Sequence, residues 1–290
     1  MYSPFDVKYI LRHLDRGSWV LDLGCGRTGS FPADSRFRAV RVDRKRHAPQ
    51  TEDPYVIADA ASLPFRDGSF GAVVANHSLE HFEQLEPSLH EIRRTLAPRG
   101  ALFVSVPDAT TLTDRLYRWL AQGGGHVNAF TSAKAVGRQV ETGTGLQWVA
   151  TRPLFSSFSF LNRHNRVTRA PRKLLLLGGG HESVLRWGSY WFRVIDRLFK
   201  TRLSRYGWAF YFGQLREDIP TQAWSNVCVR CGSAHPSQWL RDHGVFARRL
   251  LAFHCYRCPG CGAVNLMTDD THFHSTSGIS RNSPPGSAIE

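Results

Sequence analysis

The chain has 290 residues, enough for one substantial α/β core with an appended module. Its 42% hydrophobic and 12% aromatic content excludes a fully disordered chain. No apolar run approaches the roughly 20 residues needed to cross a bilayer. The net charge of +13 is concentrated, because residues 152–205 hold twelve Lys and Arg against two acids. Such a segment favours an anionic partner.

Apolar strands alternate with helices or crossovers along most of the chain. The expected strands are 19–23, 38–43, 55–58, 70–75, 101–106, 146–152 and 206–213, and the expected helices are 5–15, 84–97, 131–142 and 181–202. This alternation predicts an α/β fold, a Rossmann-like, seven-stranded and mostly parallel sheet with helices on both faces. Residues 1–15 lack the apolar stretch of a secretory signal, so we expect a cytoplasmic protein.

A glycine-rich turn follows the first strand. Gly24, Gly26 and Gly29 form the pattern G-x-G-x-x-G, in which glycine permits a tight turn and lets a ligand approach the backbone. Asp43 ends the next strand, where a carboxylate can accept both hydroxyls of a ribose. The alternative is that Asp43 only caps its strand. The pattern indicates a nucleotide-type cofactor, which a dehydrogenase would also bind.

Four segments in this order resemble the class I S-adenosylmethionine-dependent methyltransferases. They are Val20–Gly26, Val42-Asp43, Ala58-Asp59-Ala60 through Phe65, and Asp67–Phe82, which reads DGSFGAVVANHSLEHF. The stretch Leu96–Val106 is similar to the turn and fifth strand of that family. The resemblance covers about residues 5–150, and its later segments disfavour a dehydrogenase.

The resemblance implies S-adenosylmethionine as the cofactor. Gly24 and Gly26 would pack under its methionine part, and Asp22 would support their loop. The loop departs from the family pattern, since Arg27-Thr28 move the next glycine to Gly29 and make the loop one residue longer.

The same resemblance implies contacts for the rest of the cofactor. Asp43 would hold the ribose and Asp59 the adenine amino group, while the backbone of Ala60 would meet an adenine ring nitrogen.

Three histidines are candidate catalytic bases. Methyl transfer from a sulfonium is an in-line displacement, so positioning supplies much of the rate, and a base is needed only for an acceptor of high pKa. His77 and His81 follow the fourth strand, and His126 follows a glycine run after the fifth. Alternatively, Glu80 and His81 cap or orient the next helix, and His126 is a solvated loop residue.

The basic segment contains an amphipathic helix at 181–202 within an insertion at about 153–205. Its apolar stripe is Val184, Trp191 and Leu198 with Trp187 and Val194 or Ile195. Residues 152–205 could lie on an anionic membrane surface, grip a phosphorylated or lipid-linked acceptor, or bind RNA. The alternative is that the stripe packs against the core and leaves the arginines in solvent.

Cysteines near the C-terminus form two matching C-x-x-C-G turns. Cys228 and Cys231 form the first turn, and Cys258 and Cys261 form the second, with 26 residues between Cys231 and Cys258. Four thiolates in this spacing predict a structural Zn²⁺ site in a zinc-ribbon-like module, because a site with four protein ligands leaves no open position. Two alternatives are that Cys255 replaces one ligand or that the thiols bind no metal.

The pattern predicts a methyltransferase domain at 1–223, the zinc-ribbon-like module at 224–267 and a disordered tail at 268–290. The leading function is methylation of a small or lipid-linked acceptor. A lipid-linked acceptor would place the protein at the periphery of a membrane. The alternative is RNA methylation through the basic insertion and the zinc ribbon. A third interpretation is a zinc adaptor without catalysis on a vestigial cofactor fold.

Overall fold

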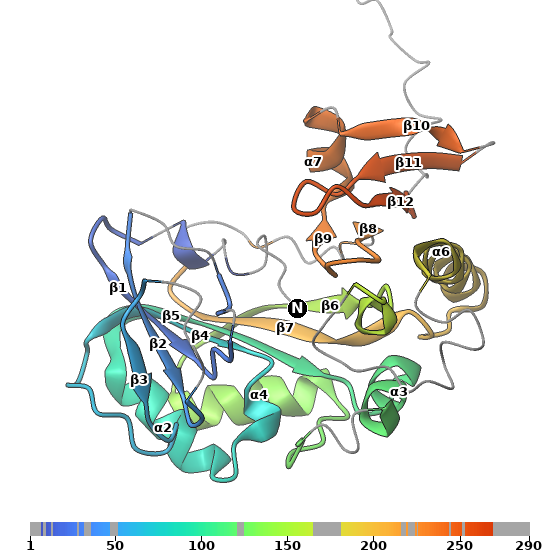
Figure 1. The fold of residues 1–290 in the computed structure, drawn as a ribbon. Helices are drawn as coiled ribbons and strands as arrows, with labels where there is room; N and C mark the ends of the chain where they lie inside the picture. The colour runs from blue at the N-terminus through green and yellow to red at the C-terminus, as the bar shows by residue number, and fades with distance from the viewer. Residues whose placement is uncertain are drawn as a thin grey trace, which may run out of the picture.

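The computed structural model in Figure 1 has a large sheet with its helices and a small module of short strands. It describes residues 7, 10–12, 14–27, 29–31, 36–46, 52–120, 125–164, 181–215, 219, 224, 226–243, 245–250 and 253–268. The expected tail therefore lies outside the described residues, apart from Thr268. Of the expected first helix at 5–15, Val7, Ile10 and Leu11 are helical and buried, and the described residues Arg12, Leu14 and Asp15 lie beyond the helix.

Seven strands form one sheet in the order β3-β2-β1-β4-β5-β7-β6. Their bounds are β1 Trp19–Leu23, β2 Arg38–Asp43, β3 Tyr55–Ile57, β4 Phe70–Asn76, β5 Leu96–Pro107, β6 Trp148–Phe155 and β7 Arg205–Gly213. Neighbouring strands are parallel from β3 to β5, and β7 runs antiparallel to both β5 and β6. The expected mostly parallel, seven-stranded Rossmann-like sheet is confirmed. The strand order reverses between β1 and β4, which is where ligands bind at the carboxyl ends of such sheets.

Alternating side chains divide the core into two layers. Along β5, Leu102 and Val104 face one layer, and Phe103 faces the other. Helices α2 (Leu85–Thr95) and α4 (Ala133–Thr144) cover the first layer, as Figure 1 shows below the sheet. The period of two along a strand is the cause, because successive side chains point to opposite faces.

Helix α3 (Leu112–Leu120) follows β5 and was not expected from the sequence. Its start carries a local signal, since the Thr111 hydroxyl accepts a hydrogen bond from the Asp114 backbone N–H over 3.3 Å. A threonine in this position satisfies one of the free N–H groups of the first helical turn.

The small module contains β8 Asn226–Val227, β9 Ala234–His235, α7 Ser237–Asp242, β10 Phe246–Leu250, β11 Phe253–Arg257 and β12 Val264–Leu266. Strands β8 and β9 form a hairpin, and β10, β11 and β12 form an antiparallel sheet. Figure 1 shows the module on the side of the large sheet opposite α2 and α4, beside helix α6 (Glu182–Phe199).

Helix α6 packs against the small module, although only partly through the face that the sequence suggested. Val184, Trp191 and Leu198 of the predicted stripe are 52%, 51% and 69% exposed. The buried position is Leu185, which shares a hydrophobic cluster with Val229 of the module. The expected burial is therefore wrong for these three positions, whereas Trp187 of the stripe packs on Phe253 of the module with ring centroids 5.0 Å apart.

Arginines of this helix are also used inside the molecule. Arg193 is buried, with its guanidinium carbon 3.7 Å from the centre of the Phe155 ring. Arg186 Nε donates a hydrogen bond to the Val264 carbonyl over 2.8 Å. The expectation that the arginines stay in solvent is wrong for these two, since the neighbouring ring and carbonyl replace water. In the described parts of the chain, every helix is too short or too polar to span a membrane.

Candidate functional site

The glycine loop leaves β1 at the reversal point of the sheet. Gly24 and Gly26 have φ values of +72° and +56°, a region that side chains other than glycine rarely adopt. A Cβ at Gly24 would lie 2.4 Å from the Cβ of Ser78, so the loop and the end of β4 are in close contact. A Cβ at Gly26 would meet nothing within 4 Å, which leaves open space over the backbone there.

Asp43 ties the end of β2 to this loop. Its Oδ2 accepts a hydrogen bond from the Gly26 N–H over 2.9 Å, and its Oδ1 accepts one from the Lys45 N–H over 2.9 Å. The carboxylate therefore lies beside the glycine loop at the carboxyl edge of the sheet, as the sequence predicts.

A buried ion pair lies next to the glycine loop. Asp22 and Arg41 form an ion pair in the protein interior, with side chains 0% and 2% exposed. Asp22 Oδ2 also accepts the Ser30 N–H over 2.7 Å, which holds the far end of the loop. A Cβ at Gly29 would lie 2.7 Å from Arg41 Nη1, so glycine there makes room for the guanidinium. The longer loop thus closes over the ion pair, and Asp22 supports it from below.

The turn after β3 holds the two adenine candidates. Asp59 Oδ1 accepts the Ala61 N–H over 2.9 Å, and its side chain is 45% exposed. Ala60 is buried beside it. The sequence analysis missed Arg94 of α2, which donates to the carbonyls of Leu63 and Phe65 over 3.0 and 2.7 Å. This arginine fixes the segment that follows the adenine candidates.

His77 lies at the carboxyl end of β4 with a positive φ of +53°. Its N–H donates to the carbonyl of Ser105, and its ring Nε2 is 3.1 Å from the Tyr206 hydroxyl. The two rings stack with centroids 5.4 Å apart. A histidine in this strained conformation is unusual, and such residues cluster at functional sites. Tyr206 is a partner that the sequence alone did not identify.

The other two histidines lie close to each other. The rings of His81 and His126 have centroids 4.9 Å apart. His81 belongs to the 3₁₀ turn η1 (Leu79–His81), in which the neighbouring Glu80 is only 2% exposed. His126 Nδ1 is 3.7 Å from Asp114 Oδ1. The prediction that His126 is a solvated loop residue is wrong, since its side chain is 10% exposed.

Burial shifts the pKa values of this group. Desolvation lowers the pKa of His126 from its ordinary value, and it raises the pKa of Asp114. The pKa of Tyr117 is raised by burial and then by the negative charges of Glu80 and Asp114. Glu80, Asp114 and His126 therefore share a poorly hydrated space at the carboxyl edge, and His81 lies exposed beside them.

A pocket lies between the large sheet and the small module. The empty space in and in front of it is about 480 Å³, part of which is open solvent. His77, Tyr206 and Arg152 line its sheet side. Gly232 and Ala234 of the module form part of its wall. The Arg152 side chain is buried in this wall. The pocket lining therefore combines a cation, an imidazole and a phenol with apolar side chains such as Phe103 and Leu154.

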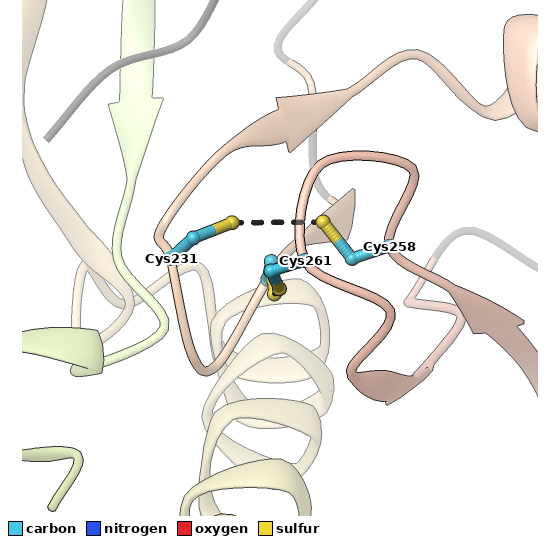
Figure 2. A group of neighbouring side chains, drawn as sticks. Cys231, Cys258 and Cys261 are labelled. Carbon is cyan, nitrogen blue, oxygen red and sulfur yellow. Dashed lines mark hydrogen bonds between the residues drawn. The ribbon is translucent and has the colours of Figure 1, made fainter. Parts of the chain in front are cut away.

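Four cysteines of the module converge as the sequence predicts. The Sγ atoms of Cys228, Cys231, Cys258 and Cys261 all lie within 4.8 Å of one another. Figure 2 shows the Cys231 and Cys258 sulfurs facing each other from two separate turns, 3.5 Å apart. Among the described residues Cys255 is outside this group, so the alternative in which it replaces a ligand is not supported.

The two cysteine turns have the same backbone hydrogen bonds. Gly232 N–H donates to the Cys228 carbonyl over 2.9 Å, and Gly262 N–H donates to the Cys258 carbonyl over 2.8 Å. Both glycines have positive φ, at +72° and +70°. The two equivalent turns bring four sulfurs together. Four thiolates are a common donor set of tetrahedral Zn²⁺ sites.

The module is joined to the large sheet by buried hydrogen bonds. Ser157 Oγ donates to the Cys228 carbonyl over 2.7 Å, and Asn162 Nδ2 donates to the Val229 carbonyl over 2.8 Å. The first cysteine turn therefore rests directly on the segment that follows β6.

Comparison with known proteins agrees with this geometry. Residues 21–104, from β1 into β5, match the family model described as a methyltransferase domain. The malonyl-[acyl-carrier protein] O-methyltransferase of Halorhodospira halophila is 30% identical over 178 residues, which cover 56% of this chain and 58% of that protein. The demethylmenaquinone methyltransferase of Thermus thermophilus is 43% identical over 61 residues, 21% of this chain and 28% of that protein. The chain thus spans less than two thirds of the length of either relative.

A solved structure of a putative methyltransferase from an antibiotic biosynthesis pathway of Anabaena variabilis covers 72% of this chain and 94% of its own, with a TM-score of 0.49 and 17% identity. The sheet order and the family match define the class of protein: a Rossmann-like α/β methyltransferase fold. The match over residues 21–104 agrees with the resemblance to methyltransferases that the sequence motifs suggested.

Proposed function

We propose that this protein transfers a methyl group from S-adenosylmethionine to a small or lipid-linked acceptor. The observation that carries the proposal is the Gly26–Asp43 hydrogen bond of 2.9 Å at the reversal point of the sheet. This hydrogen bond joins the glycine loop to the predicted ribose carboxylate at the edge of the sheet. The pocket lined by His77 and Tyr206 lies at the same end of β4 and β5.

The residues present fit this cofactor. The open space over Gly26 can accept the methionine part, and Asp43 can accept a ribose hydroxyl beside it. Asp59 and Ala60 would bind the adenine, and Gly24 and Asp22 would keep the loop in shape. When bound, the cofactor supplies an electrophilic methyl group on a sulfonium.

The pocket supports an acceptor that carries an acidic group. The Arg152 guanidinium carbon lies 3.8 Å from the centre of the Trp224 ring, so the wall offers a fixed cation in a poorly hydrated place. One relative is named for a malonyl group on acyl-carrier protein, which is an acidic, carrier-linked acceptor. We infer an acceptor of that general chemistry, oriented by Arg152.

We assign the role of proton acceptor to His77 among the three candidate histidines. It lines the pocket, whereas His81 and His126 belong to the neighbouring acidic group. The Tyr206 hydroxyl, 3.1 Å from His77 Nε2, fixes the orientation of the imidazole. A positioned histidine can take the proton of an acceptor hydroxyl as the methyl group is transferred, whereas a carboxylate acceptor is already ionised and needs no base.

The four cysteines would hold Zn²⁺ in a structural role. Small modules have too little core to fold alone, and metal binding supplies the missing free energy. A site with four protein ligands has no position left for an acceptor. Its function is to keep the module on the sheet, where Gly232 and Ala234 complete the pocket.

RNA remains the alternative acceptor, and no contact among the described residues specifically favours it. Part of the basic segment that suggested RNA is engaged internally, as Arg193 is buried against Phe155. This side chain is unavailable to a phosphate backbone on the surface.

The test is calorimetry of S-adenosylmethionine binding to the full chain, followed by transfer of a labelled methyl group. Asp43→Ala is expected to weaken binding about 10- to 100-fold, the effect of a charged hydrogen bond. Asp67→Ala is the matched control, since that carboxylate is 81% exposed and pairs with Arg94.

Label transferred to acidic small molecules or carrier-linked acids, and not to RNA, is the expected result. Absence of cofactor binding, or binding that Asp43→Ala leaves unchanged, would contradict the enzyme proposal. Label found only in RNA would contradict the acceptor class.

A further inference from the structure

Three side chains beside the proposed active site form a second group with the chemistry of metal ligands. Glu80 and His81 come from η1, and His126 comes from the loop that precedes α4. One carboxylate oxygen and two imidazole nitrogens of these residues all lie within 4.8 Å of one another. The group lies at the carboxyl edge of the sheet, remote in sequence from the cysteine cluster.

The carboxylate of Glu80 lacks a full set of partners. The residue is 2% exposed, and its Oε2 has no hydrogen-bond donor within the described part of the chain. Its Oε1 lies 3.6 Å from His77 Nδ1. A buried carboxylate with an unsatisfied oxygen is costly, and a bound cation is one way to offset that cost.

Both imidazoles are oriented as in metal-binding histidines. His81 Nδ1 lies 2.9 Å from the Gly125 carbonyl, and His126 Nδ1 lies 3.7 Å from Asp114 Oδ1. Histidine ligands commonly direct one ring nitrogen at a carbonyl or carboxylate, which fixes the tautomer and leaves the other nitrogen for the metal. Here the His81 Nδ1 is within hydrogen-bond distance of its partner, so its Nε2 is available, and the His126 Nδ1 faces a carboxylate at a longer distance.

The two segments that carry the group are fastened together. The N–H groups of Val127 and Asn128 donate to the Glu80 carbonyl over 2.8 and 3.0 Å. The Asn128 side-chain amide donates to the carbonyls of Leu79 and Phe82 over 2.9 and 2.8 Å. The loop that presents His126 is therefore held against the turn that presents the other two side chains, before any ligand binds.

We propose that Glu80, His81 and His126 bind a divalent transition-metal ion of the Zn²⁺ type. Two imidazoles and one carboxylate form a set that suits Zn²⁺ and leaves a coordination position open, unlike the four cysteines. An oxygen of the acceptor would take that open position and be polarised there. This last step rests on the proposed function, whereas metal binding by the three side chains does not.

The competing explanation is purely structural. The same contacts could serve only to fasten the loop at 125–128 to η1, with the histidines packed edge to face. The two explanations differ in the number of metal ions bound by each chain, because the cysteine cluster accounts for only one.

The experiment is a titration of the metal-free full chain with Co²⁺ as the spectroscopic probe. Thiolate ligands give intense charge-transfer absorption, and a nitrogen and oxygen site gives only weak d–d bands, so the two sites are distinguishable. We expect two equivalents per wild-type chain. Glu80→Gln and His126→Gln should each lose the equivalent without charge-transfer absorption and keep the thiolate band.

Two further variants sharpen the result. Glu86→Gln removes the same charge from an exposed position nearby and should keep both equivalents. Asp114→Asn, which removes the charge beside His126 and the ion pair with Arg118, should weaken the second equivalent about 10- to 100-fold. The retained thiolate band shows that each variant is folded, at least in the module.

One equivalent in the wild type, with thiolate absorption alone, would overturn the inference. A second equivalent that survives both Glu80→Gln and His126→Gln would overturn it as well. Calorimetry with S-adenosylmethionine on the same samples separates the two proposals: loss of cofactor binding with two metal equivalents present contradicts the proposed function and leaves the metal site standing.

Discussion

Asp22 at the end of β1 and Arg41 on the neighbouring strand form an ion pair that is shielded from solvent beneath the glycine loop. Arg41 also donates to Asp53 over 2.8 Å and to the Phe31 carbonyl over 2.8 Å. The guanidinium therefore connects β1, β2 and the loop after the glycines. Removing one charge of such a pair leaves the other buried and uncompensated.

Arg41→Met is therefore expected to lower the free energy of unfolding by about 3–5 kcal/mol. Chemical denaturation measures this loss, and Arg38→Met on the exposed side of β2 is the matched control. A loss of similar size in both variants would contradict the special role of the pair.

The effect of Arg41→Met should depend on pH. Burial raises the pKa of Asp22, and Arg41 opposes that shift, so its removal raises the pKa further. Above the unfolded pKa of about 3.9, the folded state then holds a proton that the unfolded state releases. The free energy of unfolding falls as the pH rises through that window. The difference between variant and wild type should thus be smaller at pH 4 than at pH 7.

Gly24→Ala should disturb both stability and cofactor binding. Its Cβ would lie 2.4 Å from the Ser78 Cβ, which adds about 1–3 kcal/mol of overpacking to about 1–2 kcal/mol for the left-handed backbone. Gly145→Ala is the control, since its φ of +64° carries the backbone cost and its Cβ meets nothing within 4 Å.

The clash can be removed separately. In the double variant Gly24→Ala with Ser78→Gly, denaturation and calorimetry should recover most of the overpacking cost. No recovery in the double variant would mean that contact with Ser78 is not the cause.

His77→Asn should lower kcat by about 10²-fold or more if His77 takes the acceptor proton. Asparagine tolerates a positive φ, so the backbone at +53° is kept. Tyr206→Phe should lower kcat by a smaller factor, because it removes the partner that orients the imidazole. Affinity for S-adenosylmethionine, measured by calorimetry, should be unchanged in both. A weakened cofactor affinity with normal kcat would assign His77 to the cofactor instead.

Cys258→Ser should abolish zinc binding at the cysteine cluster and lower the melting temperature, because the module loses the metal that holds its turns. Cys255→Ser is the matched control: this thiol is also buried, yet it lies outside the cluster. Metal analysis by mass spectrometry should show one zinc fewer per chain in the first variant and no change in the second. Loss of zinc from both variants would return Cys255 to the ligand set.

The sequence by itself determined the features that depend on short spacing. The glycine loop, Asp43 at the next strand end and the two C-x-x-C-G turns are local patterns, and each has a direct steric or ligand requirement. Short apolar runs at 19–23 and 70–75 and alternating residues at 38–43 and 206–213 likewise predicted strands, since these patterns are local.

Only the tertiary structure decided which distant side chains meet. The pairs Asp22–Arg41 and His77–Tyr206, and the approach of His126 to Glu80, join segments whose spacing carries no signal. The buried face of α6 was also decided this way, because a partly exposed apolar stripe and a buried arginine follow from the position of the module rather than from the period of the helix. The burial of a side chain depends on its neighbours in space, and the local sequence around a residue does not specify those neighbours.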